Sequence, residues 1–160
     1  MAFAIAFIED WPAGLREAVI QMLAALQAQP GIELPPGTAN LKLVDDAEIT
    51  ALNEQYTGNA YATDVLTFNY LEADAAGIPP GGVLEGELAD IAISQPTAAR
   101  QAAAAGIPEA DEVALLVLHG LLHLIGYDHH TEADQRTLNA LQGRILANAG
   151  LTYREFAWTD

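Results

Sequence analysis

Cysteine is absent from this chain of 160 residues, and only six lysine or arginine residues stand against 22 aspartate or glutamate residues. Without cysteine there are no disulfide bonds and no thiolate ligands, so a transition-metal site would have to use His, Asp or Glu. No apolar run approaches the roughly 18 residues of a membrane span. The N-terminal stretch "MAFAIAFIEDW" also lacks the basic start of a signal peptide. We therefore expect a cytoplasmic protein without a membrane segment.

The net charge of −16 at pH 7 would repel nucleic acid at long range. Taken alone, this charge argues against an RNA- or DNA-binding surface and suits a basic protein as partner. A hydrophobic fraction of 51% is that of a folded chain, and the length is that of one domain. Because neither an internal repeat nor a linker divides the sequence, we predict a single domain over residues 1–160.

Short apolar segments alternate with segments of helical periodicity. The patterns predict strands at 3–10, 41–45, 64–70 and 88–94, and helices at 12–28, 45–56, 95–106, 109–126 and 131–150. Thr131 and Asp134 resemble a capping box at the start of the last helix. The segment 72–87 is a long connection, either a gate over a cleft or a disordered loop. The whole predicts an α+β fold, in which about five helices pack a small mixed four-stranded sheet.

The most apolar part of the chain contains three histidines, in "HGLLHLIGYDH" at residues 119–129. On a helix, His119 and His123 project from one face, about 40° apart around the axis and about 6 Å apart along it. His129 cannot share that face by helical continuation, but Gly126 can take the left-handed conformation and reverse the chain. Three neutral imidazoles with an open fourth position are typical of a catalytic zinc. We therefore predict one zinc ion per chain on these histidines.

The histidine motif has three other interpretations: core histidines, a site for another metal, and the site of a peptidase. A single histidine on an apolar helix is more often a hydrogen-bonded core residue, but two further histidines at this spacing favour a metal. Nickel or copper would also suit such ligands. Peptidases with the HExxH motif have their glutamate base where this chain has Gly120, so a peptidase is disfavoured. His130 is expected to be solvated.

The histidine motif closely resembles the signature of the YbeY family, metal-dependent endoribonucleases of bacterial ribosomal RNA maturation. The segments "LKLVDDAEITALNEQY", "ATDVLTFNY" and "GELADIAIS" followed by "ARQA" are similar to the family in order and spacing. The resemblance implies an α+β fold with the metal-binding helix beside the sheet and zinc on the three histidines. It implies single-stranded RNA, not DNA, as substrate. It also implies a role in small-subunit ribosomal RNA maturation and ribosome quality control. The negative charge leaves two alternatives: RNA held locally by zinc, the few arginines and the exposed backbone of an edge strand, or a basic ribosomal protein as partner. The family's association with ribosome assembly favours the partner.

The catalytic residues are predicted to be His119, Arg100 and Asp128. Arg100 lies at a family arginine position in "ARQA", whereas Thr57 stands where the family usually has another arginine. A guanidinium there would stabilise charge on a phosphate, so Thr57 predicts weaker catalysis unless Arg100 compensates. Asp128 and Asp90 are candidates to orient the imidazoles by hydrogen bonds, as are backbone carbonyls.

Smaller features are interpreted structurally. Asp64 is expected to be a turn or cap residue. Three further departures from the family pattern are interpreted as adjustments of packing or backbone: Ala62, Ala89 and Leu115.

Two alternative functions stay open. One is a zinc-containing ribosome-assembly factor with weak or no nuclease activity, and the other is a metallopeptidase-like hydrolase. A structural zinc predicts that metal removal unfolds the protein, whereas a catalytic zinc predicts that activity is lost and the fold is kept. RNA cleavage would proceed by attack of activated water or of the 2′-hydroxyl, and only the second route leaves a cyclic phosphate.

Overall fold

The structure is a computed structural model that describes residues 2–70 and 86–157. Within these residues the α+β class, the four strands and the five helices expected from the sequence are confirmed. The segment expected to be a gate or a disordered connection lies almost wholly outside the described residues. The elements are β1 (Phe3–Ile8), α1 (Ala13–Ala28), β2 (Gly37–Val44), α2 (Asp46–Thr57), β3 (Val65–Asn69), β4 (Glu87–Ser94), α3 (Gln95–Ala105), α4 (Glu109–Leu124) and α5 (Glu132–Asn148).

The strands form one mixed sheet in the order β1-β2-β4-β3. Strands β1, β2 and β4 are parallel to one another, and β3 pairs antiparallel with β4 at the edge. The strand order therefore departs from the chain order, because β4 inserts between β2 and β3. This topology leaves β3 as an edge strand beside the C-terminal half of the molecule.

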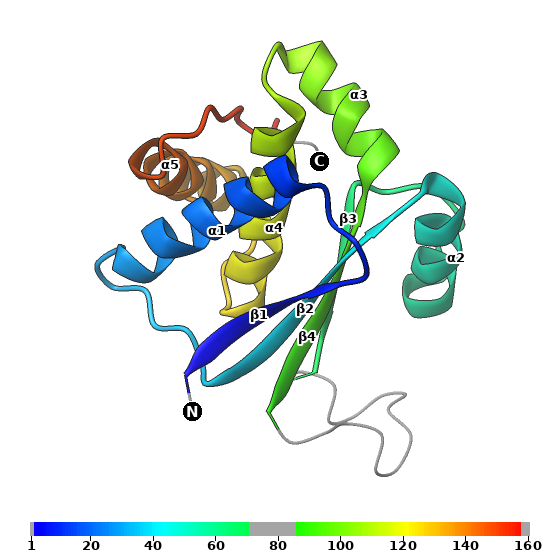
Figure 1. The fold of residues 1–160 in the computed structure, drawn as a ribbon, viewed down its shortest axis with the longest axis horizontal. Helices are drawn as coiled ribbons and strands as arrows, with labels where there is room; N and C mark the ends of the chain where they lie inside the picture. Colours follow the sequence, from blue (N-terminus) through cyan, green and yellow to red (C-terminus); the bar gives the residue numbers. More distant parts are fainter. Residues whose placement is uncertain (1, 71–85, 158–160) are drawn as a thin grey trace.

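The helices lie on both faces of the sheet (Figure 1), with α1 and α4 packed together on one face and α2 over the other. Successive side chains of a strand point to opposite faces. On β4 the α4 face receives Ala89, Ile91 and Ile93, all at most 1% exposed. The intervening Asp90 points to the α2 face, where its register partner in β2 is Asn40. Among the described residues, no helix is both long enough and apolar enough to cross a membrane.

Helix α4 lies at the centre of the core. Its residues from 111 to 118 are all buried, and it packs against α1, α3, β3 and β4. A helix whose residues 113–118 are apolar on every side is stable in water only in such a position. The run "VALLVL" is therefore the core element that the sequence predicts. Its packing fixes the position of α4, and with it the positions of His119 and His123.

The end of α4 follows the prediction made for Gly126. This glycine has a φ of 105°, in the region that favours glycine. The N–H of Tyr127 donates to the carbonyl oxygen of Leu122 at 3.0 Å, and the N–H of Gly126 donates to that of His123 at 3.1 Å. These two hydrogen bonds form the C-terminal motif that ends a helix at a left-handed glycine. The chain then reverses and enters α5, whose cap Thr131 accepts the N–H of Asp134 at 3.0 Å, as the capping box predicts.

Candidate metal centre

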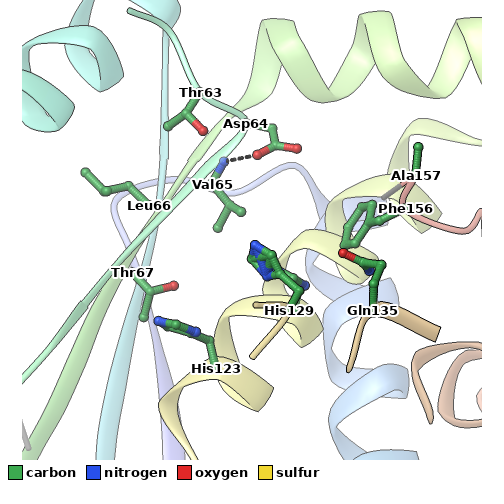
Figure 2. A pocket seen from close by; sticks show the side chains of 11 residues that line it. Thr63, Asp64, Val65, Leu66, Thr67, His123, His129, Gln135, Phe156 and Ala157 are labelled. Carbon is green, nitrogen blue, oxygen red and sulfur yellow. Dashed lines mark hydrogen bonds between the residues drawn. The ribbon is translucent and has the colours of Figure 1, made fainter. Parts of the chain in front are cut away.

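A pocket of about 410 Å³ lies between the edge strand β3 and the C-terminal part of α4 (Figure 2). The three histidines singled out from the sequence all line it, two from α4 and one from the loop after Gly126. Figure 2 shows His123 and His129 with Val65 and Thr67 of β3 nearby. The remaining lining residues come from β3, the segment before it, α5 and the C-terminal segment: Thr63, Asp64, Leu66, Gln135, Phe156 and Ala157.

His119 is held from α5. Its Nδ1 lies 2.9 Å from Oε1 of Gln142, and because an amide oxygen only accepts, Nδ1 carries the proton. This tautomer leaves the lone pair on Nε2 for a ligand bond, which is the usual arrangement around a metal-binding histidine. Gln142 is buried, and its Nε2 has no hydrogen-bond partner among the described residues. Among the described residues, the one hydrogen bond of this amide is thus the bond to the imidazole of His119.

Electrostatics keeps the His119 ring neutral. Burial is the largest cause and lowers the pKa of His119 below its ordinary value, since the charged form loses its hydration. The hydrogen bond to Gln142 and the charge of Asp64 oppose this effect, while the neighbouring His129 and His123 lower the pKa further. A neutral imidazole is the form that binds a metal ion.

The distance between the His119 and His129 rings is slightly longer than two rings that bind one ion would have. The ring centroids of His119 and His129 are 5.7 Å apart, at an interplanar angle of 45°. In a tetrahedral site with zinc–nitrogen bonds of about 2.0–2.1 Å, the centroids of two ligating imidazole rings lie roughly 5 Å apart. Within residues 2–70 and 86–157, however, no three His, Asp or Glu side chains already stand as a ligand set. The donor chemistry fits zinc, and its binding requires the rings to move closer together.

The other two residues predicted to act in catalysis lie outside this pocket. Nη2 of Arg100 is 2.8 Å from Oδ2 of Asp46, which joins α3 to α2. Asp128 instead faces His130, with Oδ2 3.7 Å from its Nε2. The catalytic roles of Arg100 and Asp128 stay predictions. His130 is exposed, as expected.

Asp90 is not placed to orient an imidazole, so that expectation was wrong. Its carboxylate accepts hydrogen bonds from Asn40 and from the hydroxyl of Tyr70, on the sheet face opposite α4. Thr57 ends α2, where its hydroxyl donates to the carbonyl oxygen of Asn53 at 2.7 Å. It does not line the pocket, so the position of the missing family arginine contributes nothing to the pocket wall here.

Gly120 has a packing role that explains why no glutamate can stand there. A Cβ at this position would lie 2.8 Å from Oγ1 of Thr67 and 3.3 Å from Cδ1 of Ile91. The glycine therefore lets α4 approach β3 and β4 closely, and a longer side chain would push the helix away from the sheet. The helix provides no general base, as the sequence indicates.

Sequence reasoning missed Gln142 and Phe156 and gave Asp64 only a structural role. Asp64 does have that role, since its Oδ1 accepts the N–H of Val65 at 2.8 Å, but it also lines the pocket. Gln142 is 23 residues from His119, and Phe156 lies in the C-terminal segment. A long-range contact of this kind leaves no periodic signal along the chain. For Gln142 the one available clue was a polar residue on the apolar side of α5.

Fold and site together define an α+β domain with a histidine-lined pocket beside the edge of its sheet. The model of the family described as Endoribonuclease YbeY matches residues 8–150. The chain belongs to this family.

Named relatives agree with the family assignment. The chain is 44% identical to Endoribonuclease YbeY of Moorella thermoacetica, over 89% of this chain and 92% of the relative. It is 37% identical to Endoribonuclease YbeY of Alkalilimnicola ehrlichii, over 92% of this chain and 86% of the relative. The fold is also similar to the solution structure of TM1509 from Thermotoga maritima. That match has a TM-score of 0.54 and 24% identity, and it covers 91% of this chain and 89% of the other.

Proposed function

We propose that this protein is a zinc-dependent endoribonuclease that cuts single-stranded RNA. Its proposed role is in the maturation of small-subunit ribosomal RNA and in ribosome quality control. The observation that carries the proposal is the meeting of His119, His123 and His129 at one pocket. The relatives named as endoribonucleases support RNA as the substrate.

A zinc ion on these histidines would supply a Lewis acid for a phosphoryl oxygen and would activate water near neutral pH. The protein's own groups prepare the site for that chemistry. Gln142 holds Nδ1–H of His119 and leaves Nε2 free. Asp64 is the one carboxylate among the described lining residues, and its Oδ2 accepts Nε2–H of Gln101 at 3.3 Å. Its fixed carboxylate is the anionic group available to accept a proton inside the pocket.

Cations are scarce at the pocket. No lysine or arginine is among the described residues that line it, and Arg100 is engaged by Asp46. Negative charge that develops on a phosphate would therefore be met chiefly by the metal. Weaker catalysis than in relatives with an arginine at the position of Thr57 therefore stays part of the proposal.

A basic protein partner accounts for the acidic surface. A groove of about 530 Å³ on the α2 face is lined by the carboxylates Glu48, Glu87 and Asp90 and by the rings of Tyr56 and Phe68. Lys42 is the one cation among its described lining residues, with Nζ 3.7 Å from Oε1 of Glu48. Carboxylates next to aromatic rings suit the lysine and arginine side chains of a ribosomal protein. In this proposal the partner brings the RNA to a protein whose own charge of −16 would otherwise repel it.

The experiment is cleavage of an end-labelled single-stranded RNA by zinc-loaded wild type, His123→Ala and His130→Ala, each shown by circular dichroism to be folded. His130 is the matched control, because it is exposed and does not line the pocket. We expect wild type and His130→Ala to cut and His123→Ala to lose at least about 100-fold in rate. A cyclic phosphate on the product would assign the attack to the 2′-hydroxyl.

Equal cleavage by all three proteins would contradict the proposal, because the activity would not depend on the histidine site. Cleavage by none of them would favour an assembly factor without intrinsic nuclease activity. Cleavage of a peptide substrate would favour the peptidase-like alternative, which Gly120 disfavours because it replaces the glutamate base of HExxH peptidases.

A further inference from the structure

The C-terminal segment, residues 151–157, forms part of the pocket wall. It follows α5, and its residues Phe156 and Ala157 line the pocket together with the three histidines. The match to the family model ends at residue 150. This part of the pocket wall therefore lies beyond the region that the family model matches.

Side chains of α4 and α5 hold the backbone of this segment by hydrogen bonds. The N–H of Thr152 donates to Oδ2 of Asp111 at 2.8 Å. Asn139 of α5 binds Phe156 twice: its Nδ2 donates to the carbonyl oxygen at 2.9 Å, and its Oδ1 accepts the N–H at 3.0 Å. The two-point bond with Asn139 sets the direction in which the Phe156 ring leaves the chain.

A buried ion pair fixes the segment from the other side. Glu112 of α4 has a side chain that is 0% exposed, and Arg154 reaches it from the C-terminal segment. The guanidinium donates to Oε1 from Nε at 2.8 Å and to Oε2 from Nη2 at 2.6 Å. A buried carboxylate needs such a partner, because an uncompensated charge in the core is strongly destabilising. The core of the protein therefore holds the segment in place.

The ring of Phe156 connects this anchor to the histidines. The guanidinium carbon of Arg154 lies 4.7 Å from the ring centroid, a cation–π contact. The ring centroid of His119 lies 4.8 Å away, at an interplanar angle of 90°. Arg154 also donates to Oε1 of Gln101 at 3.1 Å, and Gln101 in turn binds Asp64. Two lining residues of the pocket are thus tied to the same guanidinium.

We propose that Phe156 is a positioning residue for His119 and that the Glu112–Arg154 ion pair anchors it. Gln142 fixes one edge of the imidazole, and the perpendicular Phe156 ring restricts rotation of the ring plane. With both contacts present, His119 is ordered before a metal arrives, so less conformational entropy is lost on binding. The effect on the metal rests on the proposed function, but the effect on the imidazole does not.

The chain contains a matched control for Phe156. Phe7 of β1 has the same two kinds of contact: the Arg16 guanidinium 4.9 Å above its ring and the Trp11 ring at 4.9 Å in an edge arrangement. Phe7 lies on the opposite edge strand of the sheet and does not line the histidine pocket. A loss seen in Phe156→Ala but not in Phe7→Ala therefore reports the contact with His119 rather than the loss of a partly buried ring.

Two measurements on the full chain test the proposal. Zinc affinity is measured by competition with a chromophoric chelator in wild type, Phe156→Ala, Phe156→Tyr and Phe7→Ala. We expect Phe156→Ala to bind zinc about tenfold more weakly, and the other two variants to stay near wild type. Long-range ¹H–¹⁵N spectra of the metal-free proteins then report the His119 ring. The wild type should show a single Nδ1–H tautomer, which becomes averaged in Phe156→Ala.

Asn139→Ala supplies a second variant, because it releases the Phe156 backbone without leaving a charge unpaired in the core. It should change the His119 signals in the same direction as Phe156→Ala. Unchanged His119 signals in both variants would overturn the positioning role, whatever the metal does. If the wild type binds no zinc, but the single His119 tautomer is lost in Phe156→Ala, the positioning role is kept and the zinc-dependent function is contradicted.

Discussion

The sheet presents very different surfaces to α4 and to α2. Toward α4 it offers Leu41, Ile91 and Ile93, all at most 1% exposed. In α4 itself the carboxylate of Glu112 is wholly buried and is paired with Arg154. Toward α2 it offers Asn40 and Asp90, which lie within hydrogen-bond distance of each other and open to a groove. Charged groups on the α2 face thus stay open to water, whereas the buried carboxylate of α4 has an ion-pair partner.

The same difference separates the two chemistries that we propose. The α4 face supplies a packed wall from which the histidines emerge, and this wall can hold an imidazole still. The α2 face supplies an acidic surface open to solvent, which suits contact with a basic protein. Variants on each face should therefore differ in size of effect, and the following predictions run from the largest to the smallest.

The largest effect is expected for Arg154→Met. The variant leaves the carboxylate of Glu112 buried without its two hydrogen bonds, so the free energy of unfolding should fall by about 3 kcal/mol. Urea denaturation followed by circular dichroism measures it. Adding Glu112→Gln should recover much of the loss, because the charge is then removed as well. A loss below about 1 kcal/mol in the single variant would mean that Glu112 is hydrated, which would contradict the anchor.

A smaller loss is expected for Gly120→Ala. The new Cβ would lie 2.8 Å from Oγ1 of Thr67, and the overpacking should exceed the gain of about 1 kcal/mol in helix propensity. The net loss should be about 1 kcal/mol in thermal or urea unfolding. Gly14→Ala in α1 is the control, since nothing lies within 4 Å of its added Cβ and it should not destabilise. Equal effects at both glycines would show that α4 does not approach the sheet as closely as described.

Asp46, at the start of α2, predicts a pH dependence. Hydrogen bonds from Ser94, Thr97 and Arg100 lower the pKa of Asp46 from 3.8 to about 2. Because the pKa is lower in the folded state, this stabilisation is fully present above about pH 4 and is lost as the pH falls toward 2. Unfolding curves of wild type and Asp46→Asn should therefore converge over that interval. A difference in stability that stays constant from pH 5 to pH 2 would contradict the assignment.

The smallest effect is expected for Asn40→Ala on the α2 face. Nδ2 of Asn40 donates to Glu87 at 2.8 Å and to Asp90 at 3.0 Å, but the groups remain accessible to water. The free energy of unfolding should change by less than about 0.5 kcal/mol. If the groove binds a basic protein, pull-down of that partner should change more than stability does. A loss of stability as large as that of Arg154→Met would remove the contrast between the two faces.

The sequence predicted the local features of the site well. The i, i+4 spacing of His119 and His123, the left-handed Gly126 and the cap at Thr131 each depend on neighbours within a few residues. The helix that contains the first two histidines could therefore be predicted to its C-terminal end. The mixed four-stranded sheet also followed from alternating patterns and short connections.

The sequence could not predict contacts that depend on the tertiary arrangement. Asp90 was expected to reach a histidine, but β4 places it on the sheet face opposite α4. Gln142 and Phe156 reach His119 only because α5 and the residues after it fold back over α4. Likewise, nothing local shows that Glu112 is wholly buried and that Arg154, 42 residues away, is its partner.

The proposed zinc site on His119, His123 and His129 can be tested directly. Zinc content is measured by mass spectrometry after dialysis of wild type, His123→Ala and His130→Ala, produced identically and confirmed to be folded. We expect one zinc ion per chain in wild type and His130→Ala and a loss of zinc in His123→Ala. Equal zinc content in all three folded proteins, or none in wild type, would contradict it.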